Sequence, residues 1–252
     1  MLHWPDSMFS YLAGEAILFS NDAFGQHYAS ELLFNDLVDQ DELYDECIKY
    51  YANILTPFSP LVTAKINEVV GMNLPVDMIA TSHGVIWRND PLQIVTKYAE
   101  WAKDYKEDRI TIIYDSMWGG TRKLAEGIAK GIVEASPSTD VRLHNVGKSD
   151  KNDAITDIFR SRAVLVGSPT IGQGILSAVA GILEEIKGLK FKGKKASVFG
   201  CYGWSGEGNK VLAENLKAGG FELVGEGLKN QWNPDDAGYA AAVEYGKFVA
   251  KA

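Results

Sequence analysis

Strand-like and helix-like hydrophobic patterns alternate along the second half of the chain. Short runs of apolar, often β-branched residues are separated by longer segments in which apolar residues recur every three or four positions. These are the periods of buried strands and of amphipathic helices. We predict strands at 110–114, 141–146, 163–166, 196–199 and 221–224, and helices at 121–135, 153–159, 178–186, 210–216 and 237–249. Five such units predict an α/β domain with a parallel sheet covered by helices on both faces.

The first half has a different rhythm. Two short β-like runs, 9–12 and 16–20, flank an Ala-Gly-Glu turn and predict a hairpin. The other predicted elements are helices at 41–55, 60–70 and 91–105 and a strand at 76–80. The polar segment 103–108 is predicted to link the two halves, so we expect two domains, 1–107 and 108–252.

The composition is that of a globular protein that can bury a core without disulfides, with 46% hydrophobic and 23% charged residues. The net charge is −8, and residues 1–48 contain ten acidic residues and no Lys or Arg. This balance argues against a nucleic-acid partner and against a basic targeting peptide. We expect no membrane association, because no apolar run approaches the roughly 18 residues of a membrane span. Cys47 and Cys201 fit no metal or redox spacing, which favours a reduced, cytoplasmic setting.

The loop after the first strand of the second half has the composition of a phosphate-binding loop. It reads SMWGGTR over residues 116–122 and leads into the helix predicted at 121–135. Hydroxyls and backbone N–H groups at the N-terminus of a helix can bind a phosphate. The loop is neither a Walker A motif nor a G-x-G-x-x-G fingerprint, and taken alone it fits an ordinary βα turn equally well.

Two further glycine-rich loops follow the third and fourth strands of this half. They read GSPTIGQG over residues 167–174 and GCYGWSGEG over residues 200–208. The carboxyl ends of parallel strands lie at one edge of the sheet, so the three loops are expected to converge there. Two of the loops carry Trp or Tyr. A phosphate joined to a flat aromatic ring is the kind of ligand that such an edge suits.

The second half resembles the flavodoxin-like family over its whole length, which implies FMN as the cofactor and the strand order 2-1-3-4-5. By that resemblance the first loop holds the FMN phosphate and the two later loops flank the isoalloxazine ring, with Trp204 or Tyr202 beside it. Cys201 is interpreted as a small buried neighbour of the ring and not as a redox thiol. The implied FMN residues are Ser116, Met117, Trp118, Gly119, Gly120, Thr121, Ser168, Pro169, Thr170, Ile171, Gly172, Gly200, Cys201, Tyr202, Gly203, Trp204, Ser205 and Gly206.

The first half offers three possible metal ligands, His3, Asp22 and His83, each in a loop or at a strand end. A single histidine is usually a packed or surface residue, and His27 and His144 are predicted to be so, with Cys47 on a buried helix face. The neighbouring residues of His3, Asp22 and His83 favour metal binding instead. The sequence resembles the flavodiiron proteins (A-type flavoproteins) in HWPDS at 3–7, SNDAFGQ at 20–26, YYANI at 50–54, SHG at 82–84, YDSMW at 114–118 and GWSGE at 203–207.

In that family a metallo-β-lactamase-like domain of αββα architecture precedes a flavodoxin-like domain. The resemblance implies that His3 binds one iron of a diiron centre, that His83 binds the other, and that Asp22 bridges the two. It further implies reduction of O2 to water or of NO to N2O, with electrons that reach the metals through FMN. The donor would be rubredoxin or another separate carrier, since no Cys-x2-Cys pair is present. A head-to-tail homodimer or a tetramer is also implied.

The sequence departs from the family in one respect. The diiron site of the family also uses a His-x-Glu-x-Asp-His motif upstream of the position of His3, and this sequence has no such motif. The resemblance therefore implies that residues 1–107 are the C-terminal part of the lactamase-like domain, with an apolar sheet face left exposed. We expect the 252-residue chain to bind FMN without assembling the diiron site. Two alternatives are a flavodoxin-type electron carrier and a zinc hydrolase with an appended flavodoxin.

Overall fold

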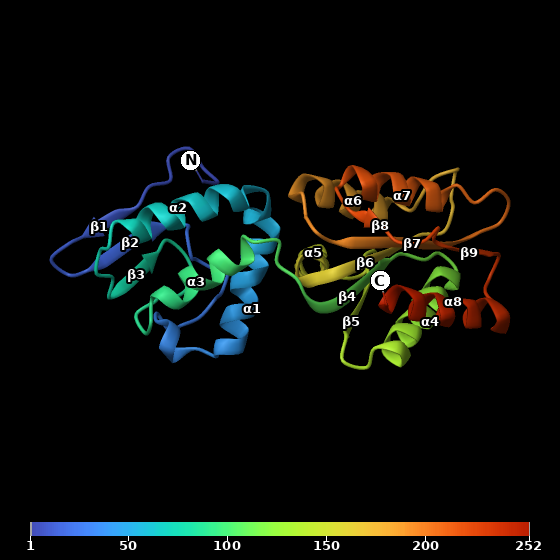
Figure 1. Ribbon diagram of the computed structural model, residues 1–252, viewed down its shortest axis with the longest axis horizontal. Coiled ribbons are helices and arrows are strands. Elements are labelled where there is room, and N and C mark those ends of the chain that lie inside the picture. The colour runs from blue at the N-terminus through green and yellow to red at the C-terminus, as the bar shows by residue number, and fades with distance from the viewer. Residues whose placement is uncertain (1, 252) are drawn as a thin grey trace. The chain divides into compact units, whose positions relative to one another are not determined.

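The computed structural model describes residues 2–251 and divides the chain into two compact units, Met1–Tyr105 and Lys106–Ala252 (Figure 1). The second unit contains a parallel sheet with the strand order β5-β4-β6-β7-β8, and β9 also pairs with β7. This is the predicted order 2-1-3-4-5, which is confirmed. Helices α4 and α8 cover one face of the sheet, and α5, α6 and α7 cover the other (Figure 1). No helix within residues 2–251 is long and apolar enough to cross a membrane.

Each element predicted for this half is present, most of them one to three residues longer at an end. The strands are β4 (Glu107–Tyr114), β5 (Asp140–Asn145), β6 (Ser161–Gly167), β7 (Lys195–Tyr202), β8 (Glu222–Leu223) and β9 (Leu228–Gln231). The helices are α4 (Gly120–Ala135), α5 (Lys151–Arg160), α6 (Ser177–Leu189), α7 (Gly208–Ala218) and α8 (Asp236–Ala250). The central strands are buried on both sides, because helices cover both faces of the sheet.

The fifth strand of the sheet is split into two pieces. β8 pairs with β7 at Lys195 and Ala196, whereas β9 pairs with β7 from Phe199 to Tyr202. Between the two pieces the chain turns through Gly225 and Gly227, whose φ angles are +68° and +84°. The sequence predicted only the first piece. The second matters for function, because β9 brings the segment that follows it to the carboxyl edge of the sheet.

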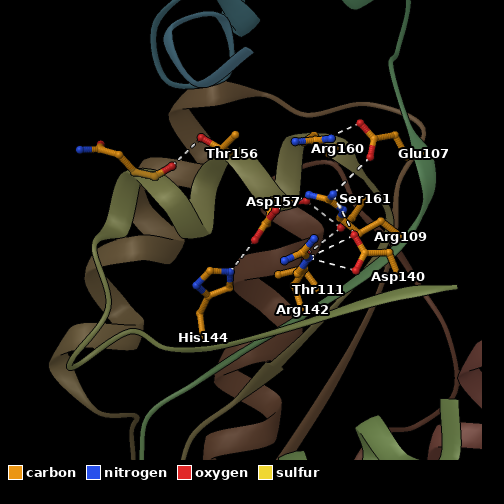
Figure 2. A network of polar contacts seen from close by, with 11 residues as sticks. Glu107, Arg109, Thr111, Asp140, Arg142, His144, Thr156, Asp157, Arg160 and Ser161 are labelled. Carbon is orange, nitrogen blue, oxygen red and sulfur yellow. Dashed lines mark hydrogen bonds and ion pairs between the residues drawn. The ribbon is translucent and has the colours of Figure 1, made fainter. Parts of the chain in front are cut away.

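The end of the predicted linker is part of the sheet. Glu107 and Asp108 were assigned to the linker because they are polar, but they begin β4. Arg160 Nε donates to Glu107 at 2.7 Å, and Arg162 Nε donates to Asp108 at 2.9 Å. Figure 2 shows the pair of Arg160 and Glu107. The two arginines come from α5 and β6, so their pairing with β4 cannot be read from the local sequence.

Helices α4 and α8 lie unusually close together because glycines line their contact. A Cβ atom added at Gly131 would lie 1.9 Å from the carbonyl oxygen of Val243, and one added at Gly246 would lie 2.1 Å from the carbonyl oxygen of Ile128. Both obstacles are helix backbone, which has no rotamer to change. Any larger residue at these positions would therefore push the two helices apart.

Replacing Gly246 with Ala is expected to lower the free energy of unfolding by about 2–3 kcal/mol, because α8 has to shift off the core. Gly181 supplies the matched control, since it is exposed in α6 and a Cβ there would meet nothing within 4 Å. Gly181→Ala should raise the same free energy by about 0.5–1 kcal/mol through better helix propensity. Urea unfolding of both variants checks this. Equal stability of the two variants would contradict the close packing of α4 on α8.

The first unit contains a small sheet and helices. Its strands are β1 (Ser10–Leu12), β2 (Ile17–Asn21) and β3 (Met78–Thr81), and its helices are α1 (Gln40–Tyr50), α2 (Ser59–Gly71) and α3 (Leu92–Trp101). The predicted hairpin is confirmed, since β1 and β2 pair antiparallel, and β3 joins β2 in parallel. The helix predicted at 91–105 ends early, at Trp101, and Asp104 adopts a left-handed φ of +48°. A π-helical turn, Tyr51–Leu55, continues α1.

One face of this small sheet is apolar and open to solvent. Ser10 pairs with Phe19 and Leu12 pairs with Ile17, which places these side chains on one face. Leu12 and Phe19 are each 47% exposed, whereas Leu18 on the opposite face is buried. The apolar face that the sequence led us to expect is therefore present in this unit.

Candidate functional site

The loop between β4 and α4 is held in the shape of an anion site. Asp115 Oδ1 accepts from the Ser116 N–H at 2.7 Å, and Ser116 Oγ accepts from the Gly119 N–H at 3.0 Å. Gly119 has a φ of +82°, a conformation that favours glycine, and it immediately precedes the first residue of α4. The loop thus presents its backbone at the positive end of the α4 dipole.

Thr121, in the first turn of α4, has a buried hydroxyl that makes no well-formed hydrogen bond among the residues that the structure describes and has only the weakly polar Cys201 thiol beside it. A buried hydroxyl without a partner is unfavourable, and an anion at this helix terminus would satisfy it. The FMN phosphate fits this requirement. Trp118 and Met117, in the same loop, are 89% and 46% exposed, so their side chains are available to a ligand and do not contribute to the core.

The loops after β6 and β7 are fastened to each other. The Thr170 N–H donates to the Cys201 carbonyl at 2.9 Å, and Thr170 Oγ1 accepts from the Gly208 N–H at 3.1 Å. A Cβ on Gly200 would lie 2.1 Å from the carbonyl oxygen of Ser168, so only glycine permits this approach. The predicted ring loops therefore form one rigid edge, with Ile171 exposed at the tip of its turn.

Cys201 connects this edge to the phosphate loop. Its sulfur lies 3.0 Å from the position that a Cβ on Gly120 would occupy. Burial raises the pKa of the Cys201 thiol to about 11, so the thiol stays protonated at neutral pH. These properties support the interpretation of Cys201 as a packed neighbour of the ligand, because redox cysteines rely on an accessible thiolate.

Trp232 also lies at this edge and was not predicted as a site residue. Trp204 is 88% exposed, and its ring centroid lies 5.1 Å from that of Trp232, at an interplanar angle of 75°. Trp232 follows β9, the strand that was not predicted. In the sequence, the signal that could have identified Trp232 is a large aromatic residue in an otherwise polar stretch.

Tyr202 packs beneath Gly206, where an added Cβ would lie 3.0 Å from its ring.

The three predicted metal ligands of the first unit also come together. His3 Nε2 lies 3.6 Å from Asp22 Oδ2, and His83 Nε2 lies 3.9 Å from Asp22 Oδ1. Each histidine thus faces a different oxygen of one carboxylate. A metal ion binds imidazole nitrogen or carboxylate oxygen at about 2.0–2.2 Å, which puts two ligands of one ion about 3–4 Å apart. The residues therefore fit one ion on each side of Asp22.

The ring of His83 is oriented by a backbone carbonyl. His83 Nδ1 lies 3.1 Å from the carbonyl oxygen of Gln26. A carbonyl can only accept, so Nδ1 carries the proton of this hydrogen bond and Nε2 of the neutral ring is free to bind a metal. The Ser82 hydroxyl donates to Asp22 Oδ1 at 3.0 Å and fixes the carboxylate.

The side chain of Gln26 holds the two ligand-bearing loops together. It is completely buried, its Nε2 donates to the Phe24 carbonyl at 3.1 Å, and its Oε1 accepts from the Val85 N–H at 2.9 Å. The backbone is strained at one of the candidate ligands and beside Gln26, since His3 and Phe24 have φ angles of +68° and +67°. Left-handed non-glycine residues beside the candidate ligands are typical of functional sites.

Tyr50 lies against this cluster and was not predicted as a site residue. Its ring centroid is 5.2 Å from that of His83 and 5.0 Å from that of the exposed His27. Burial and the nearby Asp22 carboxylate raise the pKa of Tyr50 to about 12, so its hydroxyl keeps its proton at neutral pH.

Within residues 2–251 no group of three or more His, Cys, Asp or Glu is arranged to hold one ion. Each side of Asp22 thus has two candidate ligands.

Comparisons with known proteins cover both units. Residues 112–246 match the flavodoxin family. The chain is 57% identical over 251 residues to the anaerobic nitric oxide reductase flavorubredoxin of Aliivibrio fischeri and 55% identical to that of Escherichia coli O1:K1. It covers 50% and 52% of those two proteins, so it spans about half the length of the curated relatives it matches.

Two solved structures resemble the whole chain. The rubredoxin oxygen:oxidoreductase of Desulfovibrio gigas superposes with a TM-score of 0.94 at 38% identity, over 100% of this chain and 63% of its own. The flavodiiron protein of Giardia intestinalis superposes with a TM-score of 0.91 at 31% identity, over 99% of this chain and 61% of its own. The likeness therefore extends over both the loops of the parallel sheet and the histidine and aspartate cluster.

Proposed function

Because the chain belongs to the flavodiiron protein family, with a flavodoxin domain over residues 112–246, we propose that it carries electrons through FMN to a diiron centre. That centre would reduce nitric oxide to N2O or oxygen to water. The names of the relatives support both substrates, since one is a nitric oxide reductase and another an oxygen oxidoreductase. Residues 1–107 would be part of the metallo-β-lactamase-like domain and residues 108–252 the FMN domain.

The observation that carries this proposal is the pair of distances around Asp22. A carboxylate whose two oxygens face two different imidazole nitrogens, at 3.6 and 3.9 Å, is arranged to bridge two cations. Imidazole and carboxylate ligands suit iron and leave positions open for a small gas. Asp22 would also neutralise part of the charge between the two ions. The remaining ligands of both ions would come from residues other than His3, Asp22 and His83.

Bound FMN would supply a carrier that accepts two electrons and releases them singly, and two bound irons would supply the place where the gas is reduced. The residues of this chain bind and orient these groups. The hydroxyls of Ser116 and Thr121 would donate to the phosphate, and Trp204 would offer a flat apolar surface to the ring. Gln26 aims His83 at Asp22 through its carbonyl.

The electron donor and the assembly are also part of this proposal. We propose rubredoxin or another reduced carrier as the donor, which the name of the Desulfovibrio gigas relative supports. We further propose a head-to-tail homodimer or a tetramer in which the FMN of one subunit serves the iron site of its partner.

Metal and flavin analysis of the protein, together with gas consumption, tests the proposal. We expect one FMN and two irons per subunit in a preparation that has all its metal ligands, and consumption of NO or O2 once the flavin is reduced. FMN without iron in such a preparation, when it is well folded, would contradict the diiron centre and favour an electron carrier. Zinc with esterase activity would favour a hydrolase.

A further inference from the structure

A short segment after β9 crosses from the ring loops to the phosphate loop. We call residues 232–235 the crossing segment. At its start the Trp232 N–H donates to the Tyr202 carbonyl at 2.7 Å, and Trp232 adopts a φ of +56°. The Trp232 ring lies over Gly203, where an added Cβ would be 2.8 Å from it, and contacts Trp204. The segment thus starts directly on the loop assigned to the flavin ring.

The other end of the crossing segment reaches α4. Asn233 Oδ1 lies 2.8 Å from the position of a Cβ on Gly120, the first residue of α4. Lys123 Nζ donates to the Pro234 carbonyl at 2.7 Å. Asp235 then accepts from the Gly238 N–H at 2.8 Å and caps α8. The crossing segment is therefore fixed at both ends, and its far end meets the same turn of α4 that carries Thr121.

We propose that the crossing segment is a further wall of the FMN site and that Trp232 packs against the isoalloxazine ring together with Trp204. This rests on the proposed binding of FMN. Trp232 is 57% exposed although its backbone is fixed by β9 and by the α8 cap. A rigid aromatic side chain that is left open to water at the ligand edge loses little entropy when a flat ring covers it. The Lys123–Pro234 bond positions the wall before the ligand binds.

Titration of the flavin-free protein with FMN and with riboflavin tests this role. Trp232→Ala should weaken the binding of both flavins about tenfold or more, by the same factor, because loss of one stacked aromatic residue acts on the ring. Thr121→Val should weaken FMN binding and leave riboflavin binding unchanged, because it acts at the phosphate. Val133→Ala is the control, since Val133 is an apolar residue of the same unit that is 48% exposed near the C-terminal end of α4, and it should change neither affinity.

A second variant separates ring contact from folding. Trp232→Phe keeps an aromatic ring and should recover most of the affinity for both flavins. Unchanged affinities in Trp232→Ala would overturn the proposal, as would a loss confined to FMN, which would place Trp232 at the phosphate. If the unmodified protein bound neither flavin, the proposed function would fail as well. If the unmodified protein bound both flavins and Trp232→Ala changed neither affinity, the role of Trp232 would be wrong while the proposed function would stand.

Discussion

Replacing Asp22 with Ala, in a preparation that has all its metal ligands, is expected to reduce the consumption of NO or O2 to background while the spectrum of bound FMN stays unchanged. His3 and His83 would then face each other across a gap with no carboxylate to bridge two cations. Loss of a ligand that contacts both irons should lower the rate by about 100-fold or more, since even indirect partners of a metal site are worth 10–100-fold. Iron content per FMN and gas consumption with reduced flavin measure the effect.

Asp77→Ala is the matched control for this experiment. Asp77 is an exposed carboxylate of the same unit, just before β3, and has no place in the cluster around Asp22. Its variant should keep iron, flavin and activity. If Asp22→Ala kept both irons and full activity, the bridging role would be wrong. Loss of FMN from Asp22→Ala would instead assign Asp22 to the flavin site.

Replacing Arg109 with Met is expected to lower the free energy of unfolding by about 3–5 kcal/mol, the usual effect of removing one member of a buried ion pair. Only 4% of Arg109 is exposed, and its guanidinium contacts Asp140 at 2.8 Å, Glu107 at 3.4 Å and also Asp157 (Figure 2). Without Arg109 these carboxylates would lie close together without their shared cation. His144, paired with Asp157 at 2.7 Å, also belongs to this network.

Arg142→Met is the control, because Arg142 also contacts Asp140, at 3.0 Å, but is 51% exposed. An exposed pair of this kind contributes about 1 kcal/mol or less. Urea unfolding of the two variants at neutral pH distinguishes a buried from an exposed ion pair at the same carboxylate. If the two variants lost the same free energy of unfolding, burial of the Arg109 network would add nothing to stability.

The effect of Arg109→Met should also depend on pH. Burial raises the pKa of Asp157, but the His144 hydrogen bond and the charges of Arg109, His144 and Arg142 outweigh it, so the pKa lies below its usual value. A lowered pKa in the folded state stabilises the protein above the unfolded-state pKa, and this contribution is lost as pH falls through the folded-state pKa. The difference in the free energy of unfolding between the unmodified protein and Arg109→Met should therefore be largest at neutral pH and shrink on acidification. A difference that is independent of pH would contradict this account.

The class of fold could be predicted from the sequence because each buried strand and amphipathic helix shows its own period. The elements from 110 to 249 that were predicted are all present, and the loops after β4, β6 and β7 meet at one edge as expected. The residue types of the candidate metal cluster could also be recognised, since His3, Asp22 and His83 stand in distinctive contexts. These features are local, so nearby residues are enough to reveal them.

The misses share a physical cause. β9 has the sequence LKNQ, with one apolar residue, and it is a strand because its backbone pairs with β7. Glu107 and Asp108 extend β4 because arginines distant in the sequence neutralise them. Gln26 and Trp232 acquire their roles only because the loops of Val85 and Trp204 lie beside them. Nothing in the neighbouring sequence encodes such contacts.

The sequence by itself determined the kinds of element, their order, and the residue types available for a flavin and a metal. Only the tertiary structure decided that the two oxygens of Asp22 face different histidines, and that Trp232 joins Trp204 at the flavin edge. Hydrophobic periodicity is set by neighbours a few residues away, whereas a site is set by the long-range pairing of strands such as β2 with β3 and β7 with β9.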